Sequence, residues 1–130
     1  MTQKPGVPMP PNGPVPAILG VSGYFEGKCF KISSVLRFGR DKNFNEIVYP
    51  LIPGKVISPV HCSVTYHEGK IVLCDWGSTY GTFTKKGRLD QCEKLELTYG
   101  DEFWLVAEDE KWRIVDFREI HSTTAKTGVI

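Results

Sequence analysis

The sequence lacks several features that would each point to a particular class of protein. No apolar run approaches the roughly 18 residues of a membrane-spanning helix, and the start, Met1–Pro5, lacks the apolar core of a signal peptide. Neither sign of charge dominates, because sixteen Lys and Arg residues stand against fifteen Asp and Glu. We therefore expect a cytoplasmic protein with no global attraction to nucleic acid or membranes, whose partner is recognised locally.

Cysteine is present but poorly spaced for a metal site. The four cysteines, Cys29, Cys62, Cys74 and Cys92, include no Cys-x-x-Cys pair. Three of them lie in or beside apolar runs, so we interpret them as small buried residues in a reducing compartment, with a disulfide or metal site as the less favoured alternative. The sequence also lacks a glycine-rich nucleotide loop, a paired-carboxylate motif and a nucleophile elbow. It therefore predicts no metal, no cofactor and no enzymatic activity.

The chain has the length of one domain, with segments of different character at its two ends. Residues 1–16 hold six of the nine prolines and no periodic apolar pattern, so we expect a disordered or polyproline linker, with a proline-rich ligand for another protein as the alternative. Residues 17–120 alternate short apolar runs with turn residues, which is typical of an antiparallel β-sandwich. Residues 121–130 are small, polar and aperiodic, and predict a flexible tail.

Several apolar runs are close enough in sequence to form hairpins. The two predicted hairpins consist of residues 62–67 with 70–75 and residues 102–106 with 111–115. The last of these runs is expected to return to the first strand of the domain, near residues 17–21. Pro50, Pro53 and Pro59 exclude residues 50–59 from the interior of a sheet and predict a stiffened loop.

Three stretches between these runs combine glycine, hydroxyl groups and a cation. They are Gly39-Arg40, Ser58-Pro59-Val60-His61 and Asp75-Trp76-Gly77-Ser78-Thr79-Tyr80-Gly81-Thr82. Loops between strands are where a scaffold displays binding residues. A turn rich in serine and threonine is, by itself, more often one whose hydroxyls satisfy its own backbone. The third stretch therefore indicates a site only in combination with the other two.

In their order and spacing, Gly39-Arg40, Ser58-x-x-His61 and Asp75-x-x-Ser78-x-x-Gly81-Thr82 resemble a forkhead-associated (FHA) domain of the bacterial type, over roughly residues 17–118. The resemblance implies an all-β antiparallel sandwich whose loops at one end form the binding site. It implies a phosphothreonine-dependent protein- and peptide-binding module in signalling or regulated assembly, with phosphate-independent assembly as the alternative. The implied partner is a phosphothreonine-containing protein, the substrate of a Ser/Thr kinase, and the linker suggests a longer multidomain chain.

The resemblance also assigns roles to individual residues. Arg40, Ser58 and Thr79 match positions that bind the phosphate, since a guanidinium offers fixed parallel donors and each hydroxyl adds one. Tyr80 stands where the family usually has an asparagine that holds the peptide backbone, and Pro59 stands where many members have arginine; both departures predict weaker binding. The positions that shape the loops are Gly39, His61, Asp75, Ser78, Gly81 and Thr82. The lysines expected to add long-range attraction are Lys42, Lys55, Lys85 and Lys86.

Overall fold

The structure, a computed structural model, describes residues 13–120. Within this range the chain forms eleven strands, and one helical turn at residues 117–120 follows the last of them. The strands are β1 (Pro16–Gly20), β2 (Cys29–Lys31), β3 (Val35–Gly39), β4 (Ile47–Val48), β5 (Cys62–His67), β6 (Lys70–Asp75), β7 (Thr82–Thr84), β8 (Gly87–Arg88), β9 (Lys94–Leu97), β10 (Glu102–Leu105) and β11 (Lys111–Asp116). No helix in the described part of the chain is long and apolar enough to cross a membrane.

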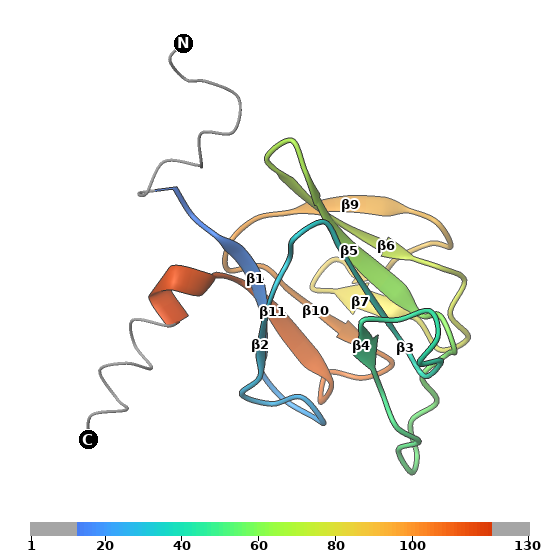
Figure 1. Ribbon diagram of the computed structural model, residues 1–130. Coiled ribbons are helices and arrows are strands. Elements are labelled where there is room, and N and C mark those ends of the chain that lie inside the picture. The colour runs from blue at the N-terminus through green and yellow to red at the C-terminus, as the bar shows by residue number, and fades with distance from the viewer. Residues whose placement is uncertain (1–12, 121–130) are drawn as a thin grey trace, which may run out of the picture.

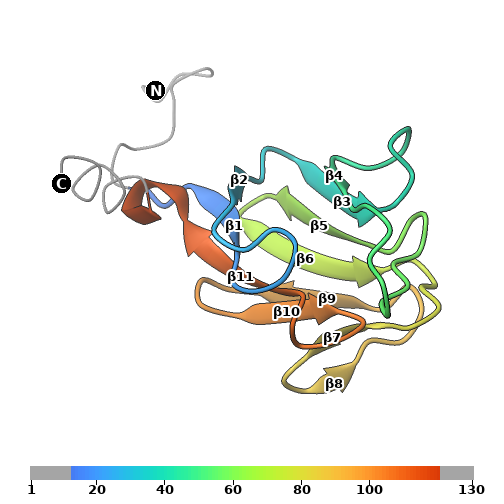
Figure 2. The same cartoon turned by 90° about the horizontal axis from the view of Figure 1, so that it is seen from below.

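The strands form two sheets that pack face to face (Figures 1 and 2). One sheet has the order β2-β1-β11-β10-β7-β8, and the other has the order β4-β3-β5-β6-β9. The predicted all-β sandwich is confirmed. Its pairings are antiparallel except that of β3 with β4, where the loop at 40–46 folds back and places two residues of each strand in parallel.

Both predicted hairpins are present. Strands β5 and β6 pair along their whole length, and the two residues between them, Glu68 and Gly69, have φ values of 52° and 79°. Positive φ at both central residues is the geometry of a tight turn that matches the twist of the flanking strands, and glycine adopts it without strain. Strands β10 and β11 form the second hairpin around residues 106–110.

The last strand returns to the first, as predicted. Strand β11 pairs with β1 from Pro16 opposite Asp116 to Gly20 opposite Trp112. The sheet therefore begins inside the segment predicted as a linker, with Pro16 at the first strand position, where a missing N–H is tolerated. Residues 1–12 of that predicted linker and the predicted tail at 121–130 lie outside the described residues. In Figure 2 the helical turn after β11 lies at one end of the sandwich, and the loops that carry the site lie at the other.

The core lies between the sheets and extends beneath the site loops. Trp112 is almost fully buried, and its ring lies 5.4 Å from that of Phe38 across the two sheets. Its Nε1–H donates to the hydroxyl of Tyr49 at 2.9 Å, which satisfies the polar ends of two buried aromatic side chains. Tyr49 begins the loop that leads to Ser58. The core therefore holds one end of that loop in place.

The cysteines follow the prediction in part. Cys62 and Cys74 are buried in β5 and β6, and burial raises the pKa of both thiols. Cys29 is half-buried and Cys92 is exposed, and all four are free. Among residues 13–120, no group of three or more His, Cys, Asp or Glu side chains could hold a metal ion.

Candidate functional site

Three loops meet at one end of the sandwich, and Ser58 is the residue at which they join. The backbone N–H of Arg40, at the end of β3, donates to the carbonyl of Ser58 at 3.1 Å. The backbone N–H of Thr79, in the loop after β6, donates to the hydroxyl oxygen of Ser58 at 3.1 Å. The structure therefore brings Arg40, Ser58 and Thr79 together from three separate loops.

The donors of this group remain available to a ligand. Arg40 is half-buried, and its Nε–H donates to the carbonyl of Ile57, which fixes the plane of the guanidinium. Its terminal nitrogens make no hydrogen bond to residues 13–120, and no carboxylate in that range pairs with it. Because the oxygen of Ser58 accepts from Thr79, its hydroxyl hydrogen is free to donate outward. Thr79 itself is exposed.

The side chain of His61 is buried and joins two of these loops by hydrogen bonds, the loop that contains Ser58 and the loop that contains Gly81. Its side chain is 0% exposed. The backbone N–H of Ser58 donates to Nδ1 at 3.1 Å, so Nε2 carries the hydrogen and donates to the carbonyl of Gly81 at 2.8 Å. Burial lowers the pKa of His61, which keeps the ring neutral and preserves this pattern at neutral pH.

Asp75 organises the loop that carries Thr79. Its buried carboxylate accepts four hydrogen bonds: from the N–H of Gly77 at 2.8 Å, from the N–H of Ser78 at 3.1 Å, and from the hydroxyls of Ser78 and Thr82. Burial alone would raise the pKa of this carboxyl, but the hydrogen bonds, led by those from Ser78 and Thr82, lower it overall. The loop therefore closes around a carboxylate that stays charged.

Two of the glycines are required by close approach. A Cβ on Gly39 would lie 2.2 Å from the carbonyl oxygen of Pro59, so only glycine lets the first and second loops touch. Gly81 has a φ of 97°, which disfavours any side chain, and a Cβ there would lie 2.7 Å from Nε of Arg88. Both positions are therefore shaped by the contact between neighbouring loops.

Two residues that position the site were not found from the sequence. The side-chain amide of Asn45 donates to the carbonyls of Asp41 and Pro59, both at 2.7 Å, and so joins the first loop to the second. The guanidinium of Arg88 donates to the carbonyls of Ser78 and Thr79 at 3.3 and 3.2 Å. Neither has a local sequence signal for this role, because the contacts that join one loop to another, Asn45 to Pro59 and Arg88 to Ser78 and Thr79, link residues nine or more positions apart.

The expectation that four lysines add long-range attraction to the site is wrong for Lys55. Lys55 is held by Glu110 at 2.7 Å and by Asp109 at 3.0 Å, so its charge is compensated within the fold. Lys85 and Lys86 lie at the turn between β7 and β8, and Lys42 lies in the loop that follows Arg40. For these three the long-range attraction stays a prediction.

Tyr80 and Pro59, which directly follow Thr79 and Ser58 in the sequence, are both exposed. The ring of Tyr80 is 52% exposed, and its hydroxyl makes no hydrogen bond to the described residues. Pro59 is exposed and has no N–H, while its carbonyl is occupied by Asn45 and by the N–H of Asp41. Pro59 therefore offers no donor to a ligand, whereas the hydroxyl of Tyr80 has no partner among the described residues and is open to one.

Because His61 is buried and joins two loops, whereas Ser58 is a predicted phosphate contact, we expect their replacement by alanine to affect folding stability differently. His61→Ala is expected to lower the free energy of unfolding by about 2–4 kcal/mol, because it leaves a cavity and unpairs the buried N–H of Ser58. It also removes one of the two hydrogen bonds that the Gly81 carbonyl accepts, the other coming from the N–H of Val106. Ser58→Ala removes one hydroxyl and should cost about 1 kcal/mol. Urea denaturation of both variants measures the difference, and a larger loss for Ser58→Ala would contradict it.

The pH dependence of stability supplies the control for this prediction. Because the pKa of His61 is lowered in the folded state, the unfolded chain binds more protons below the ordinary value of 6.5. The contribution of neutral His61 is therefore present above that value and is lost as pH falls through the window below it. This part of the pH dependence should be absent from His61→Ala.

Comparison with known proteins identifies the family. The sequence pattern of the FHA domain matches residues 36–106, which is more than half of the chain. The FHA domain of an Arabidopsis thaliana hypothetical protein is 30% identical, with a TM-score of 0.62 over 78% of this chain and 83% of that one. No curated protein matches the chain.

Two further solved structures share the fold. Mycobacterium tuberculosis EmbR, in complex with a low affinity phosphopeptide, is 18% identical with a TM-score of 0.63; the match covers 79% of this chain and 24% of EmbR, so the chain spans about a quarter of that protein. An FHA domain from an analysis of phosphothreonine-dependent interactions is 17% identical with a TM-score of 0.61, over 78% of this chain and 95% of that one. The family pattern, the sandwich and the three joined loops agree, and the chain belongs to the FHA domain family.

Proposed function

We propose that this FHA domain binds proteins phosphorylated on threonine, and that Arg40, Ser58 and Thr79 hold the phosphate. The observation that carries the proposal is the guanidinium of Arg40, which has no carboxylate partner among residues 13–120, in a residue whose backbone N–H donates to the carbonyl of Ser58. A phosphate dianion prefers charged donors in fixed geometry, and a guanidinium held in one plane provides two parallel N–H groups.

The loop contacts prepare this site before a ligand arrives. Arg40 is held by the carbonyl of Ile57, and Ser58 is held between Thr79 and His61. Donors that are already fixed lose less conformational entropy on binding than mobile ones, which leaves more of the interaction free energy for affinity. Because Pro59 adds no donor, we expect dissociation constants in the micromolar range or weaker.

Tyr80 is proposed to contact the peptide beside the phosphothreonine. Its exposed ring offers an apolar face for the threonine methyl, and its hydroxyl can bond a backbone group of the peptide. A buried methyl group contributes roughly 0.8 kcal/mol, so a several-fold preference for phosphothreonine over phosphoserine is expected.

Similar structures support the class of ligand. One contains EmbR with a phosphopeptide, and another comes from a study of phosphothreonine-dependent FHA interactions. FHA domains are binding modules, so we propose that this domain acts by recruitment and has no catalytic site of its own. The partner is then a substrate of a Ser/Thr kinase, bound in the cytoplasm by a domain of a larger multidomain protein.

Phosphate dependence can be tested directly by titration. A phosphothreonine peptide library selects the best sequence, which is then titrated in its phosphothreonine, phosphoserine and unphosphorylated forms by calorimetry at one salt concentration. We expect the affinity to fall in that order, because each step removes a contact made by Tyr80 or by the phosphate group. Equal binding of the phosphorylated and unphosphorylated forms would contradict the proposal and favour phosphate-independent assembly.

A further inference from the structure

The five arginines of the chain divide into two groups by their partners. Three of them, Arg37, Arg113 and Arg118, form ion pairs with carboxylates. Arg40 and Arg88 have no carboxylate of residues 13–120 within the 4.0 Å of an ion pair. These two are also the arginines that contact the site loops, through the carbonyls of Ile57, Ser78 and Thr79.

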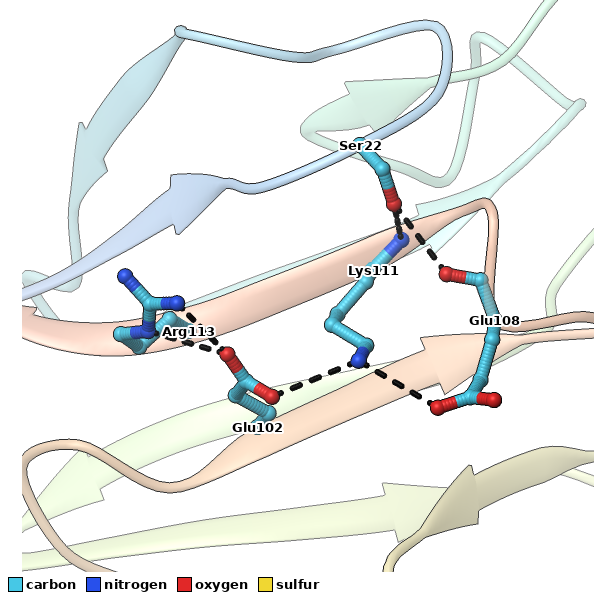
Figure 3. A network of polar contacts seen from close by, with 5 residues as sticks. All are labelled: Ser22, Glu102, Glu108, Lys111 and Arg113. Carbon is cyan, nitrogen blue, oxygen red and sulfur yellow. Dashed lines mark hydrogen bonds and ion pairs between the residues drawn. The ribbon is translucent and has the colours of Figure 1, made fainter.

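Figure 3 shows an arginine elsewhere on the surface, Arg113, whose charge is compensated by a carboxylate. Glu102 lies between Arg113 and Lys111, and accepts from Arg113 at 2.7 and 3.0 Å. Glu108 lies on the other side of Lys111 at 3.3 Å. On this face of the six-stranded sheet, Arg113 is paired with Glu102 and Lys111 with Glu108, so the charge of each cation is compensated within the fold.

Arg88 lies on the far side of Thr79 from Ser58. Thr79 contacts the Ser58 hydroxyl through its N–H and the Arg88 guanidinium through its carbonyl. Both hydrogen bonds that Arg88 makes use Nη2, are 3.2–3.3 Å long, and end on neutral carbonyls. Its Nε and Nη1 hydrogens have no partner among the described residues, and the side chain is exposed.

The carboxylates nearest in the fold do not compensate this charge. A hollow of about 240 Å³ beside Arg88 is lined by Asp75 and Asp90 among others. The carboxylate of Asp75 is buried and already accepts four hydrogen bonds. Asp90 forms no ion pair with Arg88 within 4.0 Å. The guanidinium of Arg88 therefore lies beside the loop that contains Thr79, with no carboxylate partner and with three N–H groups that make no hydrogen bond to residues 13–120.

We propose that Arg88 is a second anion contact of the site and binds an acidic group a few residues from the phosphothreonine. The proposal rests on the proposed function, since the peptide must already lie across Thr79. A guanidinium recognises a carboxylate or a second phosphate by the same pair of N–H donors. Arg88 therefore makes the domain select phosphothreonine peptides that carry a further negative charge on this side.

A charge scan on the peptide tests the assignment in the full chain. The probe is an alanine-rich peptide with one phosphothreonine, in which a single glutamate is moved from four residues before it to four residues after it. We expect one position to tighten binding by about two- to fivefold, as for an exposed ion pair, and lysine at that position to weaken it. The lysine result is measured on the unaltered protein and does not depend on the folding of any variant.

Variants then assign the effect to Arg88. In Arg88→Gln the gain from glutamate should disappear, whereas it should persist in Arg113→Gln, which makes the same charge change in the network of Figure 3. A second phosphothreonine in place of the glutamate shows which anion is preferred, and a gain from either supports the assignment. Phosphate-dependent binding with no gain at any position, or with a gain that persists in Arg88→Gln, would overturn it. Loss of phosphate dependence itself would instead overturn the proposed function.

Discussion

Arg40→Ala is expected to weaken phosphothreonine peptide binding by about 2–5 kcal/mol, a factor of roughly 30 to several thousand. The charge of Arg40 has no carboxylate partner among residues 13–120, and the Ile57 carbonyl, which accepts from its Nε–H, fixes the plane of its guanidinium. Its removal takes away two charge-assisted hydrogen bonds and leaves Ser58 and Thr79, both neutral, as the remaining proposed phosphate contacts. Calorimetric titration of the selected phosphopeptide measures the loss.

Arg37 provides a matched control. It lies in β3, three residues before Arg40, and its guanidinium and backbone N–H are both bonded to Glu46. Arg37→Ala should therefore leave peptide affinity within about twofold of the unaltered protein. Circular dichroism should show both variants folded; an Arg40→Ala protein that binds normally would remove Arg40 from the site.

Asp75→Ala is expected to cause the largest loss of stability, about 3–5 kcal/mol. The substitution removes the acceptor of four hydrogen bonds, from the buried N–H of Ser78, the buried hydroxyls of Ser78 and Thr82, and the partly buried N–H of Gly77. Because the folded-state pKa of Asp75 lies below its ordinary value of 3.8, its contribution is present above that value and is lost as pH falls below it. Urea denaturation at neutral pH measures the change.

Asp90→Ala is the control that distinguishes the loss of the hydrogen bonds to Asp75 from the loss of one negative charge. Asp90→Ala removes the same group from a surface position and should change the free energy of unfolding by less than about 0.5 kcal/mol. Similar losses for the two variants would show that the hydrogen bonds to Asp75 contribute little. Asp75→Asn should lie between them, since the amide keeps an acceptor but lacks the charge that the hydroxyls bind.

The strands and hairpins could be predicted from the sequence because their signals are local. The apolar runs on either side of Glu68-Gly69 require nothing beyond the turn to pair, and the alternation in β11 marks the residues that face the core. The short parallel pairing of β3 with β4 could not be predicted. It depends on a loop whose path is fixed by Asn45, an amide that is equally common in loops exposed to solvent.

The contact residues could be predicted from the spacing of the sequence motifs, but the residues that hold the site loops in place could not. Arg88 reaches Thr79 from a neighbouring strand, and Lys55 meets Glu110 across more than fifty residues of chain. A lysine in a loop near a predicted anion site has the same sequence signature whether its charge is free or paired. Only the fold shows that Lys55 braces the loop before Ser58 while Arg88 keeps an open charge.

The pairing of Pro16 with Asp116 bears on how the domain can be joined to other proteins. These residues face each other on adjacent strands, at the end of the sandwich opposite the three joined loops. A fusion partner or a surface tether joined near either residue is therefore attached at the end of the sandwich away from the three joined loops. Because the two attachment points are neighbours, the whole domain can also be inserted into a surface loop of a host protein as a phosphate-responsive cassette, with little separation imposed on the ends of that loop.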